Sequence, residues 1–122
     1  MKQKYSFMKS LGYAFEGIAF SIKNNSNFRI QIAVAIIVII ASIFFDVTAF
    51  EMGILGTMII LVFVCEMLNT AIEEVVNLIA KDYKIEAKIA KDVGAGMVLL
   101  ASIGSVIVGI LVFLPYIISF FK

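Results

Sequence analysis

Four polar side chains recur at helical spacing inside an otherwise apolar stretch of the chain. They are Glu66, Asn69, Glu73 and Asn77. With about 100° of rotation per residue in an α-helix, Glu73 differs from Glu66 by about 20° and Asn69 by about 60°, so they form one polar stripe. Glu74 points about 80° away from Glu66 and is expected at the boundary with water. A stripe of carboxylates and amides suits the binding of a divalent metal ion and the abstraction of a proton.

The two carboxylates of this stripe are costly inside a membrane, at about 2.5–3.5 kcal/mol for each charge. A polar seam that joins helices is the alternative interpretation, because amides hydrogen-bond between spans. Two like charges on one face repel each other, which favours a functional role. Glu66 and Glu73 are about 10 Å apart along the axis, too far to chelate one ion together. We therefore expect Glu73 to bind metal near the Lys-rich connection and the deeper Glu66 to act as a base.

A second group of chemically useful residues follows in "AKDVGAG", residues 90–96, which we interpret as a loop before the last apolar segment. Lys91 can neutralise a phosphate, and Asp92 can orient it, hold a ribose hydroxyl or reach a metal. Alone, such a pair is an ordinary solvated cap at a membrane border. Beside the polar stripe it predicts a phosphate site. Four glycines are expected instead at helix contacts: Gly94, Gly96, Gly104 and Gly109.

The elements that must position these residues are membrane helices. The chain has 122 residues, is 62% hydrophobic and has a mean hydropathy of +1.08, which excludes an ordinary water-soluble domain. A span needs about 20 apolar residues. Apolar residues at three- and four-residue spacing ahead of the first span predict an amphipathic surface helix. We thus expect a single all-α domain, residues 1–122, with a surface helix at about 5–24 and spans at about 28–46, 52–80 and 93–121.

The charged residues predict the orientation of the spans. Residues 46–51 contain no Lys or Arg, whereas residues 81–92 contain four Lys and the first 29 residues contain four Lys and one Arg. The positive-inside rule then places the N-terminus and the second connection in the cytoplasm. The net charge of +1 gives no reason to expect nucleic acid, and the absence of His removes the commonest zinc ligand. Pro115 should kink or end the last span.

Four short motifs of the chain resemble those of one known protein family. The motifs are "EMLNTAIEEVV" from Glu66, "AKD" at 90–92, "FLP" at 113–115 and "NFR" at 27–29. Together they resemble the small prokaryotic integral-membrane diacylglycerol kinase family over nearly the whole chain. The wording "EMLNTAIE" and the late "FLP" are most similar to the Gram-positive, undecaprenol kinase-like branch.

The resemblance implies an enzyme that transfers the γ-phosphoryl group of Mg-ATP to a membrane lipid hydroxyl at the cytoplasmic interface. Such kinases form homotrimers of three spans plus a surface helix, with active sites shared between chains. Carried over by motif, Glu66 would be the catalytic base, Asn69 would orient it or the substrate, and Glu73 would bind Mg²⁺. Asn25 stands where the family pattern has a second metal-binding glutamate, so an uncharged amide oxygen would take that place.

The resemblance also implies the binding residues for both substrates. Those expected to bind the nucleotide are Tyr13, Asp82, Tyr83, Lys84, Lys91 and Asp92. Those expected near the lipid are Phe28, Arg29 and Glu66. Besides Asn25, the chain departs from the family pattern at Asn77, where many members have Asp, and at Ser6, where an Arg is common.

Three functions remain open at this level. The first is a lipid kinase in a bacterial cytoplasmic membrane, with undecaprenol preferred over diacylglycerol as the acceptor and with Mg²⁺, ATP and a second and third copy of the chain as partners. The second is a small oligomeric carrier or proton relay, in which Glu66 takes up and releases a proton during transport. The third is an inactive kinase-like scaffold, which the substitutions at Asn25 and Asn77 would suit.

Overall fold

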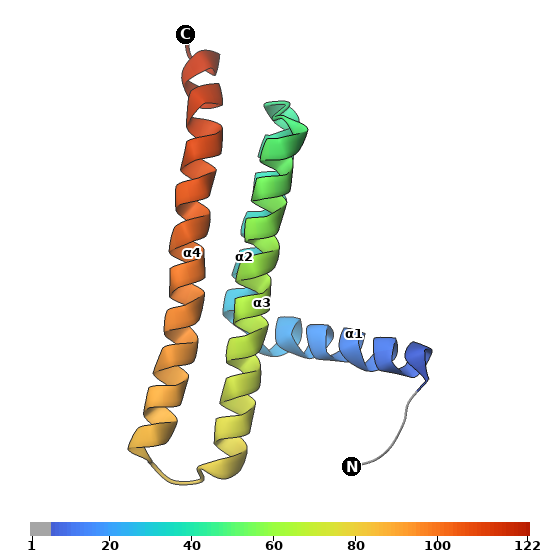
Figure 1. Cartoon of the computed structure of the whole chain (residues 1–122), viewed down its shortest axis with the longest axis vertical. Coiled ribbons are helices and arrows are strands. Elements are labelled where there is room, and N and C mark those ends of the chain that lie inside the picture. Colours follow the sequence, from blue (N-terminus) through green and yellow to red (C-terminus); the bar gives the residue numbers. More distant parts are fainter. Residues whose placement is uncertain (1–5) are drawn as a thin grey trace.

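The computed structural model describes residues 6–122, and within them the chain is helical with no strand (Figure 1). The helices are α1 (Phe7–Asn24), α2 (Ser26–Phe44), α3 (Ala49–Ile79) and α4 (Ile85–Phe120). The last three are long and apolar enough to cross a membrane. The prediction of an all-α membrane protein with one additional N-terminal helix is therefore confirmed.

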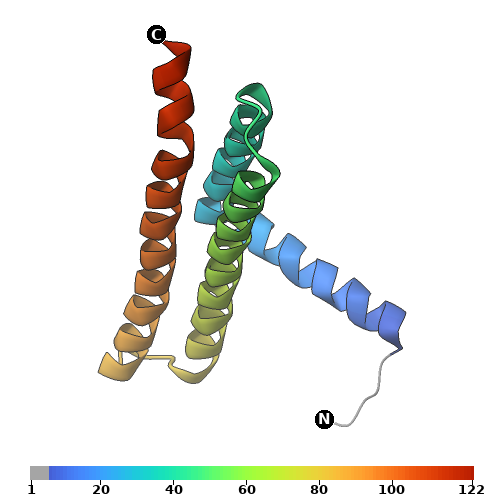
Figure 2. The same ribbon diagram turned by 45° about the horizontal axis from the view of Figure 1, so that its top comes forward.

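Helix α1 projects sideways from the three long helices (Figures 1 and 2). It begins after Ser6, whose hydroxyl accepts a hydrogen bond from the backbone N–H of Lys9, as an N-cap residue does. Large apolar side chains such as Phe7 and Phe15 are exposed on it. Exposed apolar side chains on a helix at this angle suit a helix lying in the membrane interface. The expected first residue of this helix, Tyr5, lies outside the described residues.

The long helices differ in length in a way that matters for the site. At 1.5 Å per residue, the 19 residues of α2 give about 28 Å, while the 31 of α3 and 36 of α4 give about 46 Å and 54 Å. The hydrocarbon core of a bilayer is about 30 Å thick. Helices α3 and α4 therefore extend beyond it, and they pass the level of α1 at the end where they join each other (Figure 1). We call this the Lys-rich end, after the lysines of residues 81–91.

Helix α4 begins eight residues before the expected start of the last span, at Ile85 instead of 93. The interpretation of residues 90–96 as a loop was wrong, because only residues 80–84 are non-helical here. Backbone hydrogen bonding, not apolar length, sets where a helix begins, and Glu, Lys and Ala are strong helix formers. Lys88 and Asp92 also form an ion pair one turn apart, which supports the helix. Lys91 and Asp92 therefore occupy fixed helical positions.

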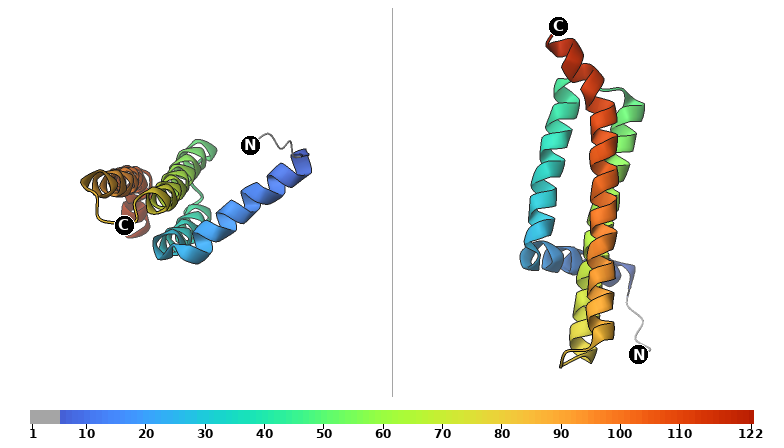
Figure 3. Two further views of the ribbon diagram at one scale, coloured as in Figure 1. Left: turned by 90° about the horizontal axis from the view of Figure 1, so that it is seen from below. Right: turned by 90° about the vertical axis from the view of Figure 1, so that its left-hand side faces the viewer.

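Pro115 does not end α4, which continues to Phe120. The last turns, in red, lean away from the rest of the helix (Figure 3, right). Proline removes one backbone hydrogen bond and crowds the preceding turn, so a bend is the expected response. Of the two outcomes anticipated for this residue, termination is wrong.

The helices pack most closely at two places. At the end far from the Lys-rich end, Val47, Leu55 and Val112 are buried together, and the Tyr116 hydroxyl donates a hydrogen bond to the Glu51 carboxylate. The other place lies around Glu66 and is described below. Most of the large apolar side chains of α2, α3 and α4 are exposed, and in a membrane protein such surfaces face lipid or another chain.

The start of α3 offers a test of local stability. The Thr48 hydroxyl accepts a hydrogen bond from the N–H of Glu51, whose carboxylate accepts one from the N–H of Thr48, which is a complete capping box. Thr48→Ala is expected to lower the free energy of unfolding by about 1 kcal/mol, measured by denaturation in mixed micelles. Thr57→Ala, which removes only a hydroxyl bonded to its own helix, is the control. Equal stability of both variants would contradict a stabilising cap.

Candidate active site

Glu66 is the most enclosed large side chain of the described residues, at 1% exposure. It lies on α3, whose buried face also carries Cys65 and Asn69. Its Oε1 atom is buried and has no hydrogen-bond partner among residues 6–122. An acid held away from water without a partner is costly. In a membrane span such a group is a candidate for function, and a carboxylate in this position can accept a proton.

Asn69 links Glu66's turn of α3 to the next turn and to α4. Its Nδ2 atom donates to Oε1 of Glu73 at 3.3 Å, so two of the expected site residues are in direct contact. Its Oδ1 atom is buried with no hydrogen-bond partner in the part of the chain from residue 6 to 122, and it lies against Gly94 of α4, where a Cβ atom would overlap it. A side chain at position 94 would therefore displace the Asn69 amide, and glycine lets α4 lie directly against it.

Other expected helix-contact glycines behave differently. A Cβ at Gly104 would touch the Met58 side chain at 3.6 Å, whereas at Gly96 and Gly109 it would meet nothing within 4 Å among residues 6–122. The prediction of helix contacts is confirmed within the chain at Gly94 and Gly104. Gly96 supplies a useful control position, two residues from Gly94 on the same helix.

A pocket of about 300 Å³ lies between the last turn of α3 and the first turns of α4, at the Lys-rich end. Tyr13 is on α1 and is not among its lining residues. Five of the six residues expected to bind nucleotide line it: Asp82, Tyr83, Lys84, Lys91 and Asp92. The structure therefore gathers the residues of the 80–84 loop and of α4 into one place, as a shared ligand requires.

The charges of this pocket are arranged by hydrogen bonds. Lys91 Nζ donates to the side-chain oxygen of Asn77 at 2.7 Å, and Lys88 Nζ pairs with Asp92 at 2.6 Å. These groups are exposed, so the bonds add little to stability. They do orient the side chains. With Lys84 the pocket has three ammonium groups against two carboxylates, an excess of positive charge that suits phosphate.

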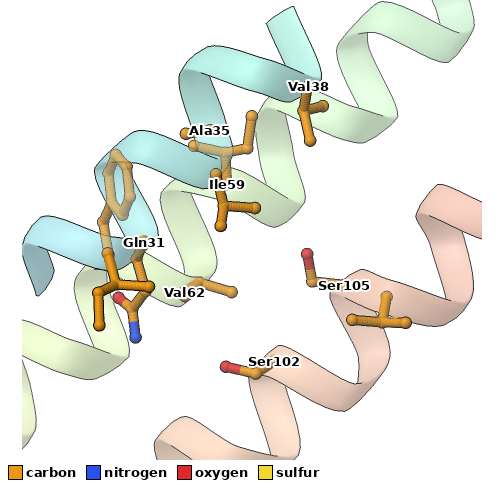
Figure 4. A pocket seen from close by; sticks show the side chains of 11 residues that line it. Gln31, Ala35, Val38, Ile59, Val62, Ser102 and Ser105 are labelled. Carbon is orange, nitrogen blue, oxygen red and sulfur yellow. The ribbon is translucent and has the colours of Figure 1, made fainter. Parts of the chain in front are cut away.

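A separate cavity of about 200 Å³ opens between α2, α3 and α4, deeper among the apolar helices. Its walls are mostly apolar, with Gln31 on one side and Ser102 and Ser105 on the other (Figure 4). Val62 and Phe63 also line it and lie one turn along α3 from Glu66. Along α3, Glu66 thus lies between the apolar cavity, which is lined by residues before it, and the cationic pocket, which is lined by residues after it.

The residues expected near the lipid occupy the start of α2. Phe28 is 3% exposed, and its ring packs on Phe63 with 5.3 Å between centroids, so it adjoins the wall of the apolar cavity. The Arg29 guanidinium donates to two backbone carbonyls of α1. Asn25, expected at the metal, is the N-cap of α2, and its Oδ1 atom accepts from the N–H of Asn27 and Phe28.

The donor set limits how a metal ion can be held. No group of three or more His, Cys, Asp or Glu side chains is clustered in residues 6–122, so a metal cage built from protein alone is not found there. Glu73 offers one carboxylate a single turn of α3 from Asn77 of the cationic pocket. Mg²⁺ is usually bound by one or two carboxylates together with substrate phosphates. The residues therefore fit an ion that arrives with a nucleotide.

Some residues of this region could not be selected from the sequence. Thr70 accepts a hydrogen bond from Asn25 and donates one to the backbone oxygen of Glu66. Ser102 and Ser105 look like ordinary polar residues of a span in the sequence, and only the structure shows that both line the same cavity. The Lys88–Asp92 pair had a visible signal, the four-residue spacing of opposite charges.

Fold and site together define a multi-pass helical membrane protein with an enclosed acid and a cationic pocket at one end of its spans. Comparison with known proteins gives the family. The model of the prokaryotic diacylglycerol kinase family matches residues 12–113. The chain belongs to that family, and by family it is a lipid kinase.

Individual relatives carry two different names. A diacylglycerol kinase of Synechocystis is 39% identical over 115 residues, which is 93% of this chain and 66%, just under two thirds, of the relative. An undecaprenol kinase of Bacillus subtilis is 38% identical over 89% of both chains. A diacylglycerol kinase of Escherichia coli is 33% identical over 82% of both. The expected family and the likeness to the undecaprenol kinase branch are confirmed.

Proposed function

We propose that the protein phosphorylates undecaprenol to undecaprenyl phosphate, with ATP as the phosphoryl donor. The observation that carries this proposal is Glu66, an enclosed acid whose Oε1 atom has no hydrogen-bond partner among residues 6–122 and which lies one turn from an apolar cavity. A lipid alcohol can lay its chain among apolar side chains while its hydroxyl meets that acid. The undecaprenol kinase of Bacillus subtilis, matched over 89% of its length, supports this acceptor. Diacylglycerol is the second candidate, favoured by the names of the Synechocystis and Escherichia coli relatives.

In the proposed reaction Glu66 accepts the proton of the lipid hydroxyl as its oxygen attacks the γ-phosphorus of ATP. A new oxygen–phosphorus bond forms, and the bond from the γ-phosphorus to the bridging oxygen breaks, so that ADP leaves with the electron pair. Asn69 orients the acid or the acceptor from the adjacent position of the stripe. Such a transfer depends on positioning and on neutralising charge more than on covalent chemistry, which a helical scaffold can supply.

The nucleotide would occupy the cationic pocket. Lys91 would face the phosphates and Asp92 a ribose hydroxyl or the metal, with Tyr13 of α1 an additional contact. The loop residues complete the set: Asp82, Tyr83 and Lys84. Mg²⁺, when bound, would neutralise phosphate charge, and Glu73 is the carboxylate best placed to hold it. Asn25 is the weaker metal candidate, because both lone pairs of its amide oxygen already accept backbone hydrogen bonds.

The setting of this enzyme is also part of the proposal. We place residues 1–122 in one kinase domain, in a bacterial cytoplasmic membrane, with the N-terminus and the Lys-rich end in the cytoplasm. The many exposed apolar side chains of the spans suit a homotrimer whose active sites are shared between neighbouring chains. A shared site would bring α1 or Arg29 of one chain to the pocket of another.

A panel of lipid acceptors tests the function. The purified protein in lipid nanodiscs is given Mg-ATP with undecaprenol, diacylglycerol or no added lipid, and labelled phosphate in the lipid fraction is measured. We expect the highest kcat/KM with undecaprenol, as the likeness to the undecaprenol kinase of Bacillus subtilis suggests. A higher kcat/KM with diacylglycerol would show that diacylglycerol, and not undecaprenol, is the acceptor. Absence of phosphorylation together with ATP-independent flux in liposomes would instead support a carrier.

A further inference from the structure

The junction between α1 and α2 is a single residue, Asn25, with an extended backbone (φ −129°, ψ 105°). One residue between two helices makes a sharp elbow, and Figure 3 (right) shows α1 turning sharply away from the end of α2. Nothing in the backbone alone holds such an angle, because one extended residue can adopt a range of φ and ψ values. The side chains around the elbow must hold it.

Asn25 uses its whole side-chain amide at this elbow. Its Oδ1 atom accepts from the N–H groups of Asn27 at 3.0 Å and Phe28 at 3.3 Å, capping α2. Its Nδ2 atom donates to the hydroxyl of Thr70 on α3 at 3.1 Å. A carbonyl oxygen has two lone pairs, and both are already used, so coordination of a metal ion through this oxygen would break the helix cap.

Thr70 connects the elbow to the candidate base. Its hydroxyl accepts from Asn25 and donates to the backbone oxygen of Glu66 at 3.1 Å. The turn of α3 that presents Glu66 is therefore joined, through one hydroxyl, to the residue between α1 and α2. A shift of the elbow would move this hydrogen-bonded turn with it.

Arg29 holds the other side of the elbow. Its Nη1 atom donates to the backbone oxygens of Ile22 at 2.8 Å and Lys23 at 2.9 Å. These carbonyls lie in the last turn of α1, where backbone oxygens lack partners and the helix dipole is negative. One cationic side chain of α2 thus caps the end of α1, while Asn25 caps the start of α2.

We propose that Asn25 and Arg29 form a clamp that fixes the elbow and seats it on Thr70, and that Asn25 is a positioning residue and not a metal ligand. The clamp sets the direction of α1 relative to α3 and the position of the Glu66 turn. The expected effect on kcat rests on the proposed lipid kinase function. The expected effect on the angle between α1 and α3 does not depend on that function.

The test compares Asn25→Ala with Thr70→Val, which removes the partner hydroxyl at nearly constant shape and carries no candidate metal ligand. Asn25→Ser retains a capping oxygen but is too short for the Thr70 contact, and covers the case in which Asn25→Ala fails to fold. Asn27→Ala, at an exposed neighbouring position, is the control. Spin labels on α1 at Lys9→Cys and beyond α3 at Lys81→Cys, in a Cys65→Ala background diluted with unlabelled chain, report the elbow angle by distance distribution.

A clamp predicts that Asn25→Ala and Thr70→Val both broaden the distance distribution and both lower kcat about tenfold. The Mg²⁺ concentration for half-maximal rate should stay within about twofold. The double variant should lose no more activity than Asn25→Ala alone, because the contact between residues 25 and 70 is already broken in that variant. A metal ligand predicts that only Asn25→Ala raises the Mg²⁺ requirement, with distances unchanged, and this result would overturn the proposal. Unchanged distances in both variants would do the same. If the wild-type chain proves inactive as a kinase, the distances still decide.

Discussion

Glu66→Gln is expected to lower kcat for lipid phosphorylation by about 10²–10⁴-fold, the usual contribution of a general base. Glutamine has nearly the same shape, so the side chain should still fill its enclosed position at 1% exposure. What it lacks is an oxygen that accepts a proton at ordinary pH. The KM for Mg-ATP should change little, because the cationic pocket, where the nucleotide is proposed to bind, lies further along α3 and on α4. Initial rates with saturating acceptor and nucleotide measure both constants.

The same variant should be no less stable than the wild type, because replacing an enclosed carboxyl group by an uncharged amide relieves a desolvation cost. Glu74→Gln is the matched control: it removes an exposed glutamate of the same helix and should retain full activity. Wild-type kcat in Glu66→Gln would remove the proposed base. An equal loss in both variants would point to the charge of α3 as a whole.

Gly94→Ala is expected to lower kcat about 10²-fold, as small displacements of catalytic groups can. The added Cβ would overlap the Asn69 side-chain oxygen, and the amide would have to rotate away. Rotation breaks the hydrogen bond from Asn69 to Glu73, so the effect should reach the site through Asn69. Gly96→Ala is the control on the same helix, since a Cβ there meets nothing within 4 Å among residues 6–122.

A double-mutant cycle separates this route from general misfolding. If Gly94→Ala acts by displacing Asn69, then Gly94→Ala in an Asn69→Ala background should cost almost nothing further, because the atom that it displaces is gone. Additive losses would show that the glycine acts by other means, for example by separating α3 from α4 along their length. Thermal unfolding of each variant in nanodiscs shows whether the fold is retained.

The two names among the relatives bear on what the site can discriminate. The polar groups around Glu66 would meet the acceptor hydroxyl, which undecaprenol and diacylglycerol share. The apolar cavity, with Gln31 and the two serines on its walls, is where the chains of the two lipids would differ. Acceptor preference should therefore respond to changes in this cavity, and the rate of transfer to changes at the stripe.

Much of the fold follows from local pattern. Apolar length predicted three spans, and three- and four-residue spacing predicted the surface helix, because each depends only on residues in one helix. The helix boundaries do not follow from apolar length: α4 starts at Ile85 and runs past Pro115. The charged first turns of α4 carry no apolar signal, yet their backbone hydrogen bonds continue the same helix.

The sequence by itself determined that this is a membrane protein with a polar stripe on its second span, and its motifs pointed to the family. Only the tertiary structure decided which polar groups meet. Lys91 bonds Asn77 and not its neighbour Asp92, Asn25 caps α2 and reaches Thr70, and Gly94 lies against Asn69. The physical reason is that spacing along one helix fixes a face, whereas a contact between helices depends on their register and separation, which the side chains of both helices set together.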